Sequence, residues 1–376
     1  MGSHYRLDNL TIIIPTYNRN YYLSRLLYYL KKNSIKNIIV ADSSEPQKHE
    51  TNKEIVRTLF GDSIAYIWAP GNEISNIYGK IISALEMVET PYATLCGDKD
   101  FPIFPGVEMC LKYLDNNPDY QVADGRYYSF QPDYSKKEID WKKVYIKKES
   151  IYSPHPLLRL KKLITKYQPL SYSIHRTETL HESMSQTVKY TDDVRFGELY
   201  SGMFPLVFGK YAHLDIDYWC REKNSSHSTS CNLPRLDDYM KAGLYDEKYM
   251  LFKEGLCANL PDSVEEIASV IDPAMHAYLL KSFPHSFDKQ SIDFATVRRL
   301  LLKYLSNDQK RFLEKYYQKF IRTSTNHRIR NTDMSPELNE ITRYLQYVLE
   351  YKVYIDDLPI RYVDLSEPSM ELKELS

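Results

Sequence analysis

The feature that most constrains the fold is an alternation of short apolar runs with helical patterns in the first part of the chain. Four runs rich in apolar and β-branched residues are predicted to be strands, at residues 10–14, 37–42, 64–68 and 92–96. Between them, apolar residues recur at helical spacing over 20–32 and 74–88. Strands and helices that alternate in this way form a mostly parallel sheet flanked by helices, so we predict an α/β fold.

Charged side chains follow three of these predicted strands. Arg19 lies just after the first strand, Asp42 ends the second, and Asp98 and Asp100 follow the fourth. In open parallel sheets, ligands bind outside the carboxyl ends of the strands. We therefore expect these four side chains to surround one binding site.

Asp98 and Asp100 are separated by one residue and come directly after Gly97. Alternate residues of an extended backbone point to the same side, so both carboxylates can converge on one point. Two hard oxygen ligands suit Mg²⁺ or Mn²⁺, with coordination positions left for phosphate oxygens. The competing interpretation is a solvated turn, because an Asp-x-Asp spacing is weak evidence by itself.

The sequence lacks the glycine patterns of the common nucleotide sites. No Gly-x-Gly-x-x-Gly follows the first predicted strand, and no Gly-Lys-Ser or Gly-Lys-Thr phosphate loop occurs, which disfavours dinucleotide-binding and P-loop folds. The formal net charge of −1 gives no electrostatic reason to expect nucleic acid as a partner. No apolar run approaches the roughly 20 residues that span a bilayer. The five cysteines form no close pair, which suits a reducing cytoplasm.

Three segments together resemble the signature of family 2-like glycosyltransferases with the GT-A fold. They are LTIIIPTYNR at 10–19, NIIVADSS at 37–44 and LCGDKDF at 95–101. Lys99 departs from the pattern, because many members of that family carry a further aspartate there. We expect its side chain to point away from the two flanking carboxylates.

The resemblance implies a metal-dependent, inverting enzyme that moves a sugar from a nucleoside-diphosphate sugar to an acceptor hydroxyl. It assigns Mg²⁺ or Mn²⁺ to Asp98 and Asp100, with Asp98 also beside the donor. It places the base and ribose of the donor near Pro15, Thr16, Tyr17 and Asp42. Cationic support for the diphosphate would come from Arg19, Lys80 and Arg221.

An acidic pair, Asp192 and Asp193, precedes a predicted helix well after the metal motif. Either residue is a typical helix N-cap, which would account for the pair without any catalysis. In the family that the chain resembles, an acidic pair in this place supplies the catalytic base. The order of preference for the base is therefore Asp193, then Asp192, then Glu198 on the same helix.

Residues 218–221 and 225–228 resemble the terminal loop of the same fold. In that family, a basic or imidazole side chain of this loop closes over the diphosphate and can reach the metal. Arg221 and His227 are the candidates here, with His227 as a further metal ligand. An exposed loop histidine is the competing interpretation for His227.

The chain divides into a predicted glycosyltransferase domain at 5–235 and an all-helical C-terminal domain at 236–376. A capping box at Ser263 and Glu266 and the pair Ser335-Pro336 mark helix starts in the second part. This part holds no constellation of chemical groups, so we expect a role in packing, homo-oligomerisation or contact with the acceptor. The basic stretch at 136–148 is either a solvated loop or a patch for anionic lipid headgroups.

These predictions place the protein in the cytoplasm, with peripheral contact at the inner face of the membrane as an open alternative. The expected partners are a nucleotide-sugar donor and a saccharide or lipid-linked saccharide acceptor, in surface polysaccharide or glycoconjugate synthesis. Two other functions stay open. One is a catalytically silent relative that only binds nucleotides or sugars. The other is a nucleotidyltransferase, which should carry a glycine-rich loop after its first strand, and residues 15–19 contain no glycine.

Overall fold

The computed structural model describes residues 7–70, 74–133, 138–143, 148–222, 234–282 and 335–350. The strands in these ranges are β1 Leu10–Thr16, β2 Ile38–Asp42, β3 Ala65–Trp68, β4 Tyr92–Leu95, β5 Asp100–Pro102, β6 Tyr120–Asp133, β7 Glu138–Lys143, β8 Ile174–Arg176 and β9 Lys210–Glu222. The helices are α1 Asn20–Lys32, α2 Pro46–Phe60, α3 Ile74–Leu85, α4 Phe104–Asn116, α5 Pro156–Thr165, α6 Thr177–Tyr190, α7 Val194–Met203, α8 Pro205–Phe208, α9 Leu236–Lys241, α10 Tyr245–Asn259, α11 Val264–Ser282 and α14 Pro336–Glu350.

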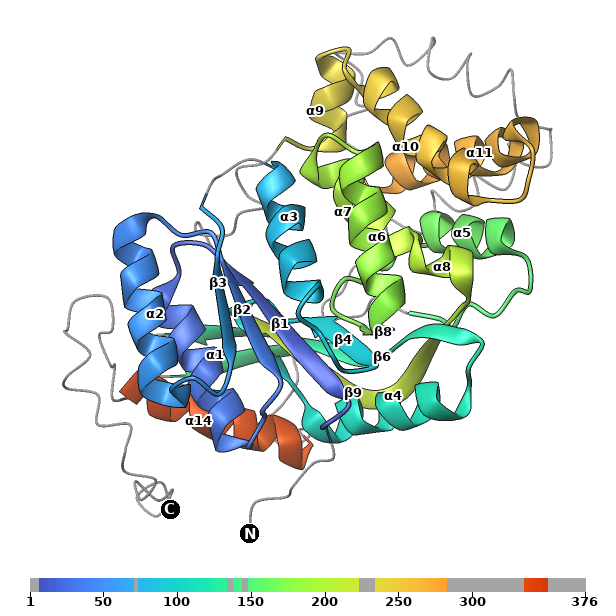
Figure 1. The fold of residues 1–376 in the computed structure, drawn as a ribbon. Helices are drawn as coiled ribbons and strands as arrows, with labels where there is room; N and C mark the ends of the chain where they lie inside the picture. The colour runs from blue at the N-terminus through green and yellow to red at the C-terminus, as the bar shows by residue number, and fades with distance from the viewer. Residues whose placement is uncertain are drawn as a thin grey trace.

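One sheet runs through the centre of the molecule in the order β3-β2-β1-β4-β8-β6-β9-β5, with β7 paired to β6 (Figure 1). The four strands predicted from the sequence, β1 to β4, are parallel to one another. Beyond β4 the sheet is mixed: β8 is antiparallel to both β4 and β6, whereas β9 is parallel to β6 and antiparallel to β5. The predicted α/β fold with a helix-flanked sheet is confirmed.

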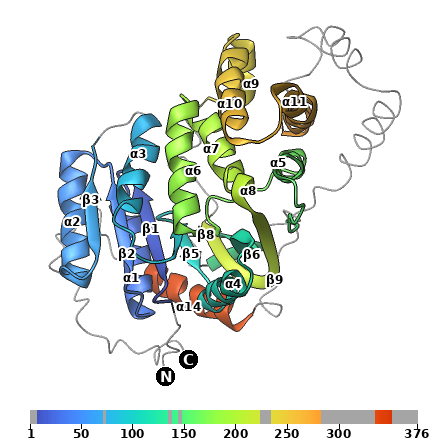
Figure 2. The same cartoon turned by 45° about the vertical axis from the view of Figure 1, so that its right-hand side comes forward.

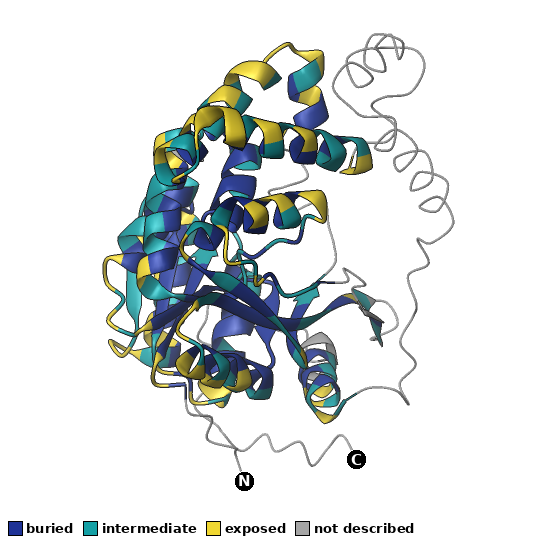
Figure 3. Ribbon diagram, turned by 90° about the vertical axis from the view of Figure 1, so that its right-hand side faces the viewer, coloured by how far each residue is buried: buried dark blue, intermediate teal, exposed yellow. Residues whose placement is uncertain are grey.

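Different helices cover the two faces of the parallel half of the sheet. Successive strand residues point to opposite faces, so neighbouring residues of one strand pack against different helices. Ile12 and Ile14 of β1 face one hydrophobic cluster, formed with α1, α2 and α4. Ile13 faces a second cluster, formed with α3 and α6. Strands β1, β2, β4 and β5 and the inward sides of the helices are buried, whereas β3 at the end of the sheet is only half-buried and the outward sides of the helices are exposed (Figure 3).

The C-terminal helices pack in two separate places. Helices α9, α10 and α11 share a hydrophobic cluster with α5, α7 and α8 at the upper right of Figure 1. Helix α14 lies beside α1 (Figure 2), where Tyr344 donates from its hydroxyl to the carbonyl of Arg25 at 2.6 Å. The division into two domains at 235/236 stays a prediction, while both groups of helices share cores with the first part of the chain.

One segment differs from its prediction. Residues 218–221, predicted to begin a loop, instead form the end of β9, where they pair with β5. No helix among the described residues combines the length and the apolar character that crossing a bilayer requires.

Candidate functional site

The ends of β1 and β4 bring Thr16, Arg19 and Asp98 together. Thr16 Oγ1 donates to Asp98 Oδ2 at 2.9 Å, and Arg19 Nη1 donates to Asp98 Oδ1 at 3.2 Å. Asp98 is only 1% exposed. Burial raises the pKa of its carboxyl, although Arg19 and Thr16 act in the opposite direction. Asp98 is thus a buried acid that is partly compensated by one guanidinium.

Asp100 meets Arg221 across two strands. The register of β5 with β9 sets Asp100 opposite Arg221, whose Nε lies 3.3 Å from Asp100 Oδ2. Trp219 Nε1 donates to the same oxygen at 3.2 Å. Burial raises the pKa of Asp100 to about 6, against the opposite effects of Arg221 and Trp219. Gly97 gives this carboxylate room, because a Cβ there would lie 3.3 Å from Asp100 Oδ2.

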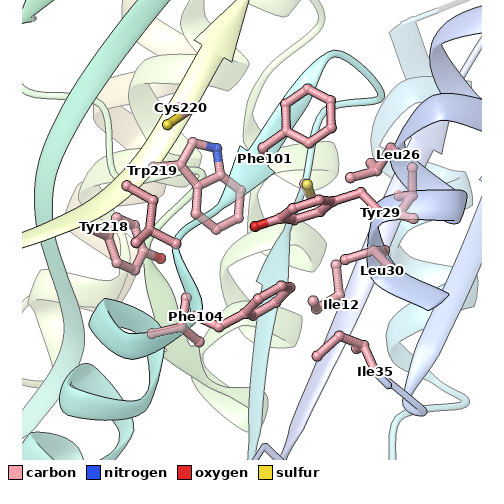
Figure 4. Close-up of a cluster of buried hydrophobic side chains, with 14 of the residues drawn as sticks. Ile12, Leu26, Tyr29, Leu30, Ile35, Phe101, Phe104, Tyr218, Trp219 and Cys220 are labelled. Atoms are coloured by element: carbon pink, nitrogen blue, oxygen red, sulfur yellow. The ribbon is translucent and has the colours of Figure 1, made fainter. Parts of the chain in front are cut away.

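An aromatic cluster beneath β5 holds this segment in place. The ring of Tyr29 lies between those of Phe101 and Phe104, with centroid distances of 5.1 and 5.5 Å (Figure 4). The Tyr29 hydroxyl donates to the carbonyl of Pro102 at 2.8 Å. Because these side chains are buried and tightly packed, the backbone that carries Asp100 has little freedom to move.

Lys99, between the two aspartates, packs against α1. Its ammonium lies 5.0 Å from the centre of the Tyr22 ring, and the residue is 7% exposed. Nearby, Arg25 and Glu222 form a buried ion pair with a distance of 2.6 Å. The cation of Lys99 is therefore kept close to the site and lies against an aromatic face.

The carboxylates are a donor set that fits a divalent cation. They are hard oxygen ligands, and burial raises the pKa of both Asp98 and Asp100, which a bound cation would counteract. Among the described residues, no three or more His, Cys, Asp or Glu side chains gather as a metal site. A cation held by this pair would therefore need ligands from a diphosphate or water. His227, the third predicted ligand, lies outside the described residues.

Asp42 is fully buried at the end of β2. Its carboxylate accepts hydrogen bonds from the Ser44 amide at 2.7 Å, Asn52 Nδ2 at 2.9 Å and the Tyr66 hydroxyl at 2.5 Å. These bonds shape the loop after β2. A ribose or base that reached this carboxylate would have to displace one of its partners.

Lys80 of α3 joins the ends of β1 and β2. Its Nζ donates to the Thr16 carbonyl and to Ser43 Oγ, each at 2.8 Å. Burial lowers the pKa of Lys80 to about 8. Pro15 and Tyr17 are half-buried at the same end of β1. The structure thus brings the predicted donor-site residues of β1, β2, α3 and β4 to one edge of the sheet.

Asp193 is the N-cap of α7. Its Oδ1 accepts from the amides of Arg195 at 2.8 Å and Phe196 at 3.0 Å. Its Oδ2 is buried without a hydrogen-bond partner, 3.9 Å from Lys248 Nζ. Burial raises the pKa of Asp193. Asp192 is exposed and pairs with Lys248 at 2.8 Å. Capping therefore accounts for one oxygen of Asp193, and the other lies near the ammonium of Lys248.

Glu198 lies further along α7, with its side chain 46% exposed and 3.8 Å from Arg195 Nη1. Desolvation of its carboxyl raises the pKa of Glu198, whereas the charges of Arg195 and Arg221 lower it. The arginine that contacts Asp100 therefore also acts on Glu198.

A pocket with a volume of about 270 Å³ lies beside Glu198, between α7 and the C-terminal helices. It is lined by Tyr167, Arg195, Glu198, Leu199, Arg235, Leu236 and Tyr278. Of these, only Glu198 was predicted from the sequence. Arg195 could have been found from its spacing of three residues before Glu198, which sets both on one helix face. Tyr167, Arg235 and Tyr278 come from three separate segments, and no local pattern marks them.

Known proteins resemble this chain in sequence over part of its length and in fold. Residues 11–174 match Glycosyl transferase family 2. The crystal structure of S. aureus TarS 1-349 is similar, with a TM-score of 0.53 and 13% identity over 77% of each chain. The structure of TarS 1-349 in complex with UDP-GlcNAc gives a TM-score of 0.53 and 14% identity over 77% of each chain. No curated protein matches the sequence. At these identities, the structural likeness shows a shared fold.

Proposed function

We propose that this protein, which matches Glycosyl transferase family 2 over residues 11–174, transfers a sugar from a nucleoside-diphosphate sugar to an acceptor hydroxyl and inverts the anomeric carbon. The observation that carries the proposal is the pair of buried carboxylates, Asp98 and Asp100, each held by an arginine at one edge of the sheet. The fold shared with TarS, which was solved with UDP-GlcNAc, makes a UDP-sugar the first donor to test.

The diphosphate of the donor would lie against Arg19 and Arg221. Their side chains are 20% and 42% exposed, so each guanidinium contacts an aspartate and still has a surface open to a ligand. Guanidinium groups bind phosphate oxygens through paired hydrogen bonds. Tyr17 and Pro15 would contact the base and ribose, while Asp42 and Lys80 hold the backbone of Ser44 and Thr16.

We further propose that Asp98 and Asp100 hold Mg²⁺ or Mn²⁺ when the donor binds. A bound ion would supply positive charge to the diphosphate leaving group. Thr16 and Trp219, which donate to these carboxylates, keep them oriented. Without a bound ion, Arg19 and Arg221 offset the negative charge of the two carboxylates.

The acceptor proton would pass to a carboxylate of α7. Asp193 is the first candidate, because its Oδ1 is fixed by two amides while Oδ2 makes only a 3.9 Å ion pair with Lys248, and its raised pKa favours proton uptake. Asp192 and Glu198 follow in that order. As the proton moves to the carboxylate, the acceptor oxygen bonds to the anomeric carbon and the bond to the diphosphate breaks. This single displacement inverts the configuration.

Thermal unfolding with UDP tests the donor site without relying on activity. With Mn²⁺ and UDP at about 100 times its Kd, folding should be stabilised by about 2.7 kcal/mol, seen as a raised melting temperature. Asp98→Asn with Asp100→Asn should abolish the rise. Asp193→Asn should keep it but lower transfer by about 10²-fold or more.

Asp215→Asn is the matched control, because this aspartate is 94% exposed in its pair with Arg126. It should retain both the rise and the transfer. A rise of equal size without metal, or one that survives the double substitution, would contradict the metal site. A product that keeps the anomeric configuration of the donor, read by NMR, would contradict the single displacement.

A further inference from the structure

We propose that Lys99 weakens the binding of a free divalent cation to Asp98 and Asp100, so that the site holds the ion only together with the diphosphate of the donor. The inference rests on the proposed function, because it takes these two carboxylates as ligands of the ion. It gives a role to the one residue of the segment 95–101 whose charge is opposite to that of its two acidic neighbours.

The side chain of Lys99 is kept beside the two carboxylates. The residue is 7% exposed, and its ammonium lies 5.0 Å from the centre of the Tyr22 ring, whose face attracts a cation. Its carbonyl accepts from the amide of Glu222 at 3.4 Å, which connects this backbone to the end of β9. Burial lowers the pKa of Lys99, whereas the charges of Asp98 and Asp100 act in the opposite direction. The ammonium is therefore close enough to interact electrostatically with both carboxylates.

Positive side chains outnumber the carboxylates at this site. Arg19 Nη1 lies 3.2 Å from Asp98 Oδ1. Arg221 Nε lies 3.3 Å from Asp100 Oδ2. Each carboxylate thus already has a cationic partner, and Lys99 adds a further positive charge beside them. Within the described ranges, no His, Cys, Asp or Glu side chain joins the two carboxylates as a third metal ligand. An ion that binds alone therefore meets more positive than negative charge.

The other charged groups nearby do not reverse this balance. Glu222 acts electrostatically on Lys99, but it is bound to Arg25 at 2.6 Å, and both side chains of this ion pair are buried. Further along the same edge of the sheet, the charge of Asp42 acts on Lys80. Each of these acids is therefore matched by a cation of its own. The surplus of positive charge at the site remains.

The charge of Lys99 acts differently on a free ion and on an ion that arrives with a nucleotide. Like charges repel, and the repulsion is strong where burial limits screening by water and salt. A diphosphate reverses the balance of charge, because its oxygens are negative and also supply coordination positions for the ion. By linkage, the ion and the nucleotide then each raise the affinity of the site for the other. Lys99 thus keeps the empty site from being filled by the ion alone.

Electron paramagnetic resonance of Mn²⁺ tests the inference on the full chain without nucleotide, at constant pH and ionic strength. Lys99→Gln should bind Mn²⁺ about tenfold or more tightly than the wild type, because a repelling charge is removed. Lys99→Met is a second neutral variant that should behave alike, so the result does not depend on the folding of one substitution. Lys99→Arg keeps the charge and should retain the weaker affinity of the wild type.

Lys189→Gln is the matched control. The ammonium of Lys189 also lies over a tyrosine ring, 4.8 Å from the centre of Tyr190, but it belongs to α6 and not to the segment 95–101. This variant should bind Mn²⁺ as the wild type does. Adding Asp98→Asn and Asp100→Asn to Lys99→Gln should remove the gain in affinity, which assigns the gain to these two carboxylates.

Three results would overturn the inference. In the first, the neutral variants bind Mn²⁺ no more tightly than the wild type. In the second, Lys189→Gln gains as much as Lys99→Gln, or the gain survives the loss of both aspartates. In the third, Mn²⁺ alone raises the melting temperature of the wild type as much as Mn²⁺ with UDP. A normal manganese-dependent shift with UDP in the wild type would confine a failure to Lys99, whereas its absence would remove the proposed metal site itself.

Discussion

The carboxylate of Asp124 and those of Asp98 and Asp100 are all buried, but they differ in the number and charge of their partners. Asp124 of β6 is fully buried and accepts from Ser173 Oγ at 2.8 Å, the Tyr211 hydroxyl at 2.6 Å and His213 Nδ1 at 2.8 Å, and it also pairs with Lys148. Burial alone would raise its pKa, but Lys148 and His213 outweigh burial and hold the pKa of Asp124 below its usual range.

Asp98 and Asp100 show the opposite balance. Each accepts from one neutral donor and contacts one partly exposed arginine. Burial therefore dominates, and the pKa of both carboxyls is raised. Similar burial with fewer partners leaves these two acids able to gain from a further cation, whereas Asp124 is already satisfied. The comparison separates a carboxylate that supports the fold from a pair suited to a ligand.

The largest expected effect follows from removing the charge of Asp124. Asp124→Asn leaves Lys148 buried beside a neutral partner, so the free energy of unfolding should fall by about 3–5 kcal/mol. Asp100→Asn should change it by about 1 kcal/mol or less, because Arg221 is 42% exposed and can turn to water. Urea unfolding of both variants measures the difference.

The exposed pair of Arg126 with Asp215 calibrates this measurement. Asp215 is 94% exposed, so Asp215→Asn should cost no more than about 0.5 kcal/mol. Equal losses in Asp124→Asn and Asp100→Asn would remove the distinction between the two groups of carboxylates.

Much of the proposed donor site at the carboxyl ends of the parallel strands could be predicted, because the sequence patterns that mark it are local. Apolar runs located β1, β2 and β4, and the aspartates after β4 are two residues apart in sequence. The partners of Asp124 were beyond such reasoning. Lys148 falls in the basic stretch 136–148, for which we predicted a solvated loop or a lipid patch. Both predictions were wrong for Lys148, because its side chain is buried and pairs with Asp124. The two residues are 24 positions apart in sequence, so no local pattern indicates the pair.

The same limit applies to Arg221. Its contact with Asp100 depends on β9 continuing to Glu222, whereas the sequence suggested a loop from residue 218. Strand pairing over such a separation is set by the register of the whole sheet and leaves no periodic pattern at one position. Residue types and strand ends can be predicted from the sequence, but the long-range contacts that set the pKa of a carboxyl cannot.

His175 gives a pH-dependent test in the strand beside Asp124. It is 1% exposed, its Nε2 lies 2.9 Å from the Leu170 carbonyl, and burial lowers its pKa to about 4. The unfolded chain takes up this proton below about pH 6.5, but the folded protein does so only near pH 4. The contribution of His175 to stability should therefore fall by on the order of 3 kcal/mol as the pH drops from about 6.5 to about 4. The raised pKa of Asp100 acts in the opposite direction over the same window, so the difference between the wild type and a His175 variant isolates this contribution.

The measurement is the free energy of unfolding at several pH values for the wild type and His175→Gln. The variant should lose this part of the slope. The depressed pKa of Asp124 acts only at lower pH, because its contribution is lost as the pH falls below its unfolded value near 3.9. Parallel curves between pH 6.5 and 4 would show that His175 is not the group responsible.

The smallest expected effect concerns the room beside Asp100. A Cβ on Gly97 would lie 3.3 Å from Asp100 Oδ2, so in Gly97→Ala the carboxylate must shift by a few tenths of an ångström. We expect a change in unfolding free energy of about 1 kcal/mol or less, but a weaker manganese-dependent shift with UDP. Gly79→Ala is the control, because nothing lies within 4 Å of its Cβ and alanine favours helix α3 by about 1 kcal/mol. It should stabilise the protein and keep the full UDP shift. If Gly97→Ala also keeps it, the position of the Asp100 carboxylate does not govern nucleotide binding, and Asp100 belongs with Asp124 as a structural residue.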